Sequence, residues 1–90
     1  MHTTMPIVAP REGDRVVAQD GDLGCVDRVL RSEAARAIYL VVAVGAVGRR
    51  KYPVIHCGLV ESVDRAERTV YVRGRRSSLQ RLPESPPIVI

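Results

Sequence analysis

Short runs of β-branched residues, separated by turns that contain glycine or aspartate, constrain the fold of this chain more than any other feature. Residues 38–44 are apolar on both faces, which is typical of a strand at the centre of a fold. Residues 69–73 alternate, with Val70 and Val72 on one face and more polar side chains on the other. This pattern predicts an all-β domain rather than a helical one.

The sequence predicts further strands at residues 15–18, 23–31 and 52–56, and either a short strand or an irregular crossing at 59–63. Asp20-Gly21 offers the positive φ angles that a tight hairpin turn needs. Gly24 is expected to mark a β-bulge, because a residue without Cβ tolerates the local kink. Residues 77–82 predict one helical turn, with serine as its N-cap and Pro83 as its stop.

A chain of 90 residues has room for one core, because so short a chain buries only about 60% of its unfolded surface. A small closed antiparallel β-barrel of five or six strands, with a short C-terminal helical turn, is the most economical arrangement, since closure removes free strand edges. An open two-sheet sandwich is the alternative. Prolines gather at both ends, so we divide the chain into an N-terminal arm, 1–12, a domain, 13–83, and a C-terminal apolar tail, 84–90.

The longest apolar stretch, residues 37–47, is about half of the length that a membrane-spanning helix needs. The first six residues lack the charged start and the apolar core of a signal peptide, so we expect no membrane span, no export and a cytoplasmic location. There Cys25 and Cys57 would stay reduced, and we interpret both as small buried thiols.

His56 and Cys57 are the residues that would most readily suggest chemistry. Neighbours on a strand point to opposite faces, so these two side chains would not share a metal ion or act as base and nucleophile. The spaced glycines of residues 21–24 and 45–48 lack the lysine and the long helix of a phosphate-binding loop, and they indicate turns. We therefore expect no catalytic residue, no metal, no cofactor and no enzymatic activity.

Positive charge is concentrated in the second half of the chain. Residues 1–45 contain five arginines and six acidic residues, whereas residues 46–90 contain nine basic and four acidic residues. Such a face would dock an acidic protein, pair with RNA phosphates, or remain a solvated surface without a dedicated partner. Aromatic residues, which would stack on bases, are only 3% of the chain. The candidate binding residues are Arg49, Arg50, Lys51, Arg73, Arg75 and Arg76, with the apolar Ile88, Val89 and Ile90.

The order of these segments resembles the PRC-barrel family, whose β-barrel occurs in the photosynthetic reaction centre H subunit and in a ribosome maturation factor. The resemblance is carried by residues 13–17, Asp20-Gly21, 24–30, 39–44, 54–64, 69–72 and 77–83. Pro53 stands three positions earlier than the proline of many members, and Arg28 stands where an acidic residue is frequent. The resemblance implies a free-standing PRC-barrel, in a group similar to assembly and interaction modules rather than enzymes.

These observations together predict a non-enzymatic interaction or assembly module. We expect it to pair with itself as a homodimer or to bind a protein partner, because apolar tails on so small a core favour association. The alternative is an RNA- or ribosome-associated protein that uses the same arginines.

Overall fold

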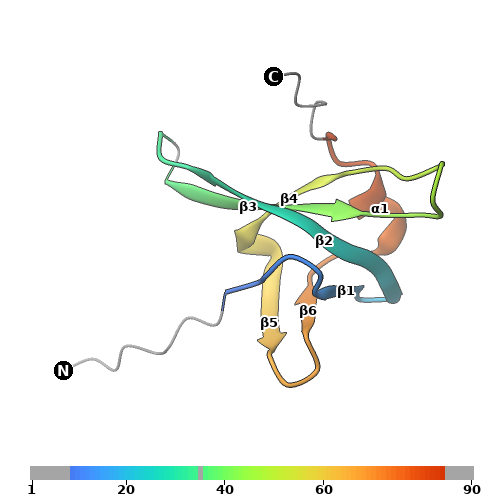
Figure 1. Ribbon diagram of the computed structural model, residues 1–90, viewed down its shortest axis with the longest axis horizontal. Coiled ribbons are helices and arrows are strands. Elements are labelled where there is room, and N and C mark those ends of the chain that lie inside the picture. The colour runs from blue at the N-terminus through green and yellow to red at the C-terminus, as the bar shows by residue number, and fades with distance from the viewer. Residues whose placement is uncertain (1–8, 35, 85–90) are drawn as a thin grey trace.

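Strands dominate the computed structural model, which describes residues 9–34 and 36–84. The elements are β1 (Arg15–Ala18), β2 (Gly21–Ser32), β3 (Ala37–Ala43), β4 (Val54–His56), the 3-10 turn η1 (Cys57–Leu59), β5 (Val60–Asp64), β6 (Thr69–Val72) and the short helix α1 (Arg76–Gln80) (Figure 1). The predicted β-rich class is confirmed, and the segment 59–63 proves to be mainly strand β5.

The six strands form one sheet in the order β4-β3-β2-β1-β6-β5. This sheet is open, with β4 and β5 at its edges, so the closed barrel expected from the sequence is not formed by the described residues. The expected antiparallel pairing also fails at one place, because β1 lies parallel to β6 with Arg15 opposite Thr69. The two edge strands are consecutive in the chain and separated only by η1. The chain itself, rather than a ladder of hydrogen bonds, therefore connects the two edges.

One hydrophobic cluster receives side chains from both halves of this sheet. In Figure 1 the β5–β6 hairpin crosses the long β2–β3 hairpin steeply, so the sheet bends around its inner face. Leu79, the one buried residue of α1, joins the cluster, and the half-buried Val60 and Val63 of β5 pack against it. The strand residues at the centre of the cluster are Val16, Leu23, Val26, Leu40, Val42, Ile55, Val70 and Val72.

Strand β2 is the longest strand, and it pairs with β1 on one side and β3 on the other. Its register with β1 shifts where Val16 faces Gly24 and Val17 faces Asp22, which leaves Leu23 as the extra residue. The β-bulge therefore lies at Leu23, one residue before the predicted position at Gly24. A Cβ atom on Gly24 would lie only 2.0 Å from the carbonyl oxygen of Ala43. Close approach of the β2 and β3 backbones thus requires glycine here.

We expect Gly24→Ala to lower the free energy of unfolding by about 3 kcal/mol, because the backbones must separate to admit the methyl group. Urea denaturation of the purified variants measures this loss. Gly48→Ala is the matched control: nothing lies within 4 Å of its Cβ position, and only its positive φ of 90° opposes the substitution. The control should lose about 1 kcal/mol. Equal losses in the two variants would contradict the close-approach explanation.

Candidate interaction surfaces

Asp14 is a fully buried charge between β1 and the turn that joins β5 to β6. Arg65 donates Nη1–H to Oδ2 and Nη2–H to Oδ1, the second contact at 3.4 Å. The backbone N–H of Arg11 donates to Oδ2 at 2.9 Å, and Nε of Arg68 lies 4.0 Å from Oδ1. Two arginines of the basic second half are therefore held in an internal cluster, and sequence analysis did not find its acidic centre.

The environment of Asp14 keeps its carboxylate ionised. Burial raises the pKa of Asp14, but hydrogen bonds from Arg65 and from the Arg11 backbone, with the charges of Arg65 and Arg68, outweigh burial and lower it below 3.8. The backbone carbonyl of Asp14 also accepts the N–H of Val26 at 2.8 Å. The same residue therefore links the N-terminal segment, β2 and the β5–β6 turn.

Asp20 binds the start of α1 from a turn distant in sequence. Its Oδ1 accepts the backbone N–H of Arg76 at 2.8 Å and lies 3.6 Å from Nε of the same arginine. The hydrogen bond from the Arg76 backbone lowers the pKa of Asp20. Arg75 is the N-cap residue and makes no side-chain cap, so the predicted serine cap is wrong. Arg73 pairs with Glu61 at 3.7 Å, so of the candidate binding residues Arg73, Arg75 and Arg76 only Arg75 has no ion-pair partner among the described residues.

The loop between β3 and β4 carries three cationic side chains. Arg49, Arg50 and Lys51 are exposed, and their side chains have no hydrogen-bond or ion-pair partner among the described residues. The backbone of Lys51 pairs with Val44 through hydrogen bonds of 2.8 and 2.9 Å, which fixes the base of the loop. Val47 is 85% exposed within the loop.

The C-terminal segment runs beside this loop. Val54 N–H donates to the carbonyl of Pro83 at 2.9 Å, and Tyr52 N–H donates to Oε1 of Glu84 at 2.8 Å. The carbonyl of Pro53 accepts from β3, so this stretch lies between β3 and the C-terminal segment. Ile88, Val89 and Ile90 of the predicted tail lie outside the described residues. We define the tail-root surface as Val47, Arg49, Arg50, Lys51 and Glu84.

A cavity of about 370 Å³ opens on the outer face of β1, β2 and β3. Arg15 faces Cys25, and Cys25 faces Ala43, so their side chains form a row across three strands. Arg50 of the β3–β4 loop also lines this cavity. The structure thus brings one predicted binding residue, Arg50, close to Arg15, which sequence analysis did not select because it lies in the less basic half.

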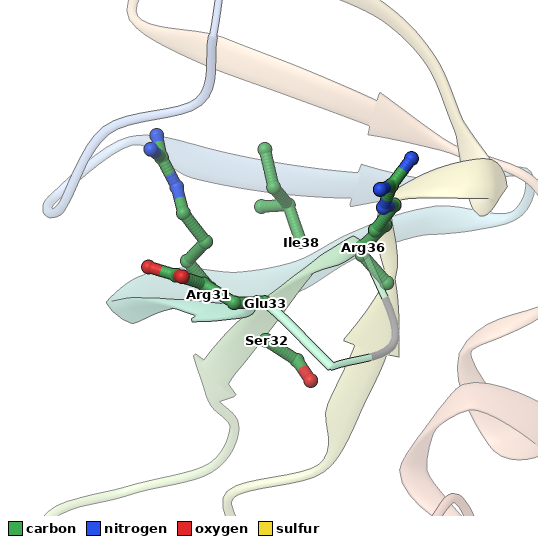
Figure 2. A pocket seen from close by; sticks show the side chains of 6 residues that line it. Arg31, Ser32, Glu33, Arg36 and Ile38 are labelled. Atoms are coloured by element: carbon green, nitrogen blue, oxygen red, sulfur yellow. The ribbon is translucent and has the colours of Figure 1, made fainter.

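A second cavity, of about 410 Å³, lies at the turn between β2 and β3. Figure 2 shows that Arg31 and Arg36 extend to the same side of the hairpin as Ile38, which stands between them, whereas Ser32 points the other way. Arg31 and Ile38 are direct cross-strand neighbours. Residues 32–36 lie between the predicted strands 23–31 and 38–44, and no binding role was predicted for them. The sequence feature that could have indicated this cavity is the pair of arginines, Arg31 and Arg36, on either side of a short turn.

The thiols and the histidine do not form a common site. Cys25 is exposed and Cys57 is half-buried, so the prediction of two buried thiols is wrong. His56 ends β4, its Nδ1 accepts the N–H of Gly58 at 2.8 Å, and its ring meets Tyr39 edge-on at 5.2 Å. Within residues 9–34 and 36–84, no group of three or more His, Cys, Asp or Glu side chains is placed to hold a metal ion.

Comparison with known proteins finds no matching family model and no matching curated protein. Within the described part of the chain, no helix has the length and apolar character needed to cross a membrane.

We expect Asp14→Asn to destabilise the fold by about 2 kcal/mol at neutral pH, because Arg65 loses a charged hydrogen-bond acceptor. The lowered pKa of Asp14 means that its stabilisation is present above its ordinary value of 3.8 and is lost as the pH falls through the lower folded value. Urea denaturation at several pH values should therefore show the parent and Asp14→Asn converging in strong acid. Asp27→Asn, which removes an exposed ion pair, is the control and should have little effect. A gap that does not change with pH would contradict this role.

Proposed function

We propose that this protein is a non-enzymatic interaction or assembly module that pairs with a second copy through its apolar tail, 84–90, beside the tail-root surface. The observation that carries this proposal is the position of Pro83 and Glu84, which lie along residues 52–54, next to a loop whose cations have no partner among the described residues. The root of the apolar tail and the basic loop thus belong to one surface. We place the protein in the cytoplasm, where Cys25 and Cys57 would stay reduced.

The edges of the sheet support contact through the tail rather than strand-to-strand pairing. Strand β5 has a register shift between Val60 and Ser62 and an exposed charge at Glu61, and both features discourage pairing at an edge. Strand β4 already donates the N–H of Val54 to Pro83. Both edges therefore offer a second copy little room for a regular ladder.

We also propose a relationship to the PRC-barrel family. Its support is that the resembling residues at 13–17, 24–30, 39–44 and 69–72 contribute to β1, β2, β3 and β6. The open sheet departs from the closed barrel that this family implies. Free-standing members resemble assembly modules, and this likeness is one reason to propose a non-enzymatic role.

The second candidate function is RNA or ribosome association. The observation that favours it is the run of three unpaired cations, Arg49, Arg50 and Lys51, with Arg15 close to the second of them across a cavity. Tyr71 is 39% exposed and would offer a face for stacking. Such binding would weaken steeply as salt rises, because each phosphate contact releases counterions.

Light scattering on the full chain tests the first function. We expect a mass twice the chain mass of 9.9 kDa, and 9.9 kDa for the triple variant Ile88→Ser, Val89→Ser, Ile90→Ser, because the apolar contact is lost. The matched control is Arg75→Ser, which changes an exposed cation outside the tail-root surface and should keep the dimer mass. A monomeric parent, or a tail variant that remains dimeric, would refute pairing through the tail.

The same measurement with a mixed-sequence single-stranded RNA separates the two functions. For an assembly module, the mass stays that of the dimer at low and high salt. A mass that rises with RNA at low salt, and no longer rises in the variant Arg49→Ser, Arg50→Ser, Lys51→Ser, would instead establish the nucleic-acid function.

A further inference from the structure

Two non-glycine residues of the described chain adopt the left-handed backbone conformation, and both are arginines. Arg36 has a φ of 50° and Arg68 a φ of 51°. This conformation is unfavourable for a residue with a Cβ atom and is ordinarily occupied by glycine or asparagine. We therefore examine whether an interaction of the arginine side chain favours arginine at each position.

Arg68 has a reason inside the domain. Its Nε lies 4.0 Å from the buried carboxylate of Asp14, and its carbonyl accepts the N–H of Arg15 at 2.8 Å. The charge of Arg68 helps to keep Asp14 ionised. Arg68 therefore has an interaction within the fold that favours a cation at this position.

Arg36 has no comparable side-chain interaction among the described residues. Its backbone N–H donates to the carbonyl of Glu33 at 3.2 Å and closes the β2–β3 turn, which a glycine would do equally well. Its guanidinium is exposed and has no partner among residues 9–34 and 36–84. Arg31, at the end of β2, is exposed and likewise without a partner in this range. Both line the cavity of about 410 Å³ at this turn.

We propose that this cavity binds an acidic segment of a protein partner in extended conformation, with its carboxylates on Arg31 and Arg36 and an aliphatic side chain on Ile38. The two cations stand on either side of Ile38 on one face of the hairpin (Figure 2). An extended segment places alternate side chains on one face, so acidic, apolar and acidic residues at alternate positions match this order. Guanidinium groups pair with carboxylates through paired hydrogen bonds.

Glu33 favours a peptide over a nucleic acid at this place. Its exposed side chain lines the same cavity and would repel a continuous line of phosphates. A segment with two separated carboxylates is repelled less, because it carries fewer negative charges along its length. The site lies at the Ala37 end of β3, whereas the tail-root surface lies beyond the other end, at Val44, so it does not depend on the proposed self-association.

Nuclear magnetic resonance of the ¹⁵N-labelled full chain tests the proposal with the peptide acetyl-Glu-Ser-Val-Ser-Glu-amide. We expect saturable shifts of the Nε–H signals of Arg31 and Arg36 and of the Ile38 amide. The control peptide, acetyl-Gln-Ser-Val-Ser-Gln-amide, should leave these signals unchanged. Equal shifts with both peptides, or no shift with the acidic peptide, would refute the site.

Arg36→Gly separates binding from folding. Glycine suits the positive φ, so the midpoint of thermal unfolding should equal or exceed that of the parent, while binding of the acidic peptide weakens about tenfold. Arg31→Gln, which leaves the turn unchanged, should weaken binding similarly. Arg68→Gly is the matched control: it removes the other left-handed arginine, so the unfolding midpoint should fall as Asp14 loses a cation, and binding should persist.

Three outcomes would overturn the proposal. The first is parental affinity in both Arg36→Gly and Arg31→Gln, which would place the peptide elsewhere. The second is a lower unfolding midpoint in Arg36→Gly, which would assign the arginine to the fold. The third is a single-stranded RNA that shifts the same signals at lower concentration than the peptide, which would assign the cavity to nucleic acid.

Discussion

The buried carboxylate of Asp14 is the interaction on which the joining of the two halves of the sheet depends. The β2–β3–β4 half and the β5–β6 half meet at β1, whose pairing with β6 is parallel and therefore has no connecting turn to hold it in register. Asp14 precedes β1 directly and binds Arg65 and Arg68 in the turn that leads into β6. A buried charge is tolerated there because guanidinium and backbone N–H groups replace the water that it loses.

Acidic side chains also decide which arginines of the second half are paired within the fold. The buried Asp14 pairs with Arg65 and Arg68, and the exposed Asp20 and Glu61 pair with Arg76 and Arg73. Among the described residues, no acidic side chain pairs with Arg31 or Arg36 at the β2–β3 turn, although Glu33 lies there, or with the cations of the β3–β4 loop. Cations without a partner among the described residues thus occur in the first half as well, at the β2–β3 turn, and not in the second half alone.

The local sequence pattern predicted most strands of this fold correctly. It failed where contacts between residues far apart in the sequence determine the structure. Alternation and β-branching gave the strands, and the absence of a Cβ atom at Gly24 placed the β-bulge within one residue of Leu23. The parallel β1–β6 pair and the open edges depend on contacts that no local pattern encodes. The helix start shows the same limit, because Asp20, 56 residues earlier, takes the place that local rules give to a serine. Cys25 was misjudged from residue type, although Val26 beside it points inward and so turns the thiol outward.

The shortness of β4 explains why the β2–β3 turn is available for binding. Strand β4 pairs with β3 only from Tyr39 to Val41, so between Tyr39 and the turn β2 and β3 continue as a ribbon without a third strand among the described residues. A two-stranded ribbon has little stability of its own and depends on its continuation into the core. Its apolar side chains are incompletely covered, because Leu30 and Ile38 are only half-buried. A longer β4 would pair with β3 next to Ile38, so the open edge and the proposed peptide site have the same structural origin.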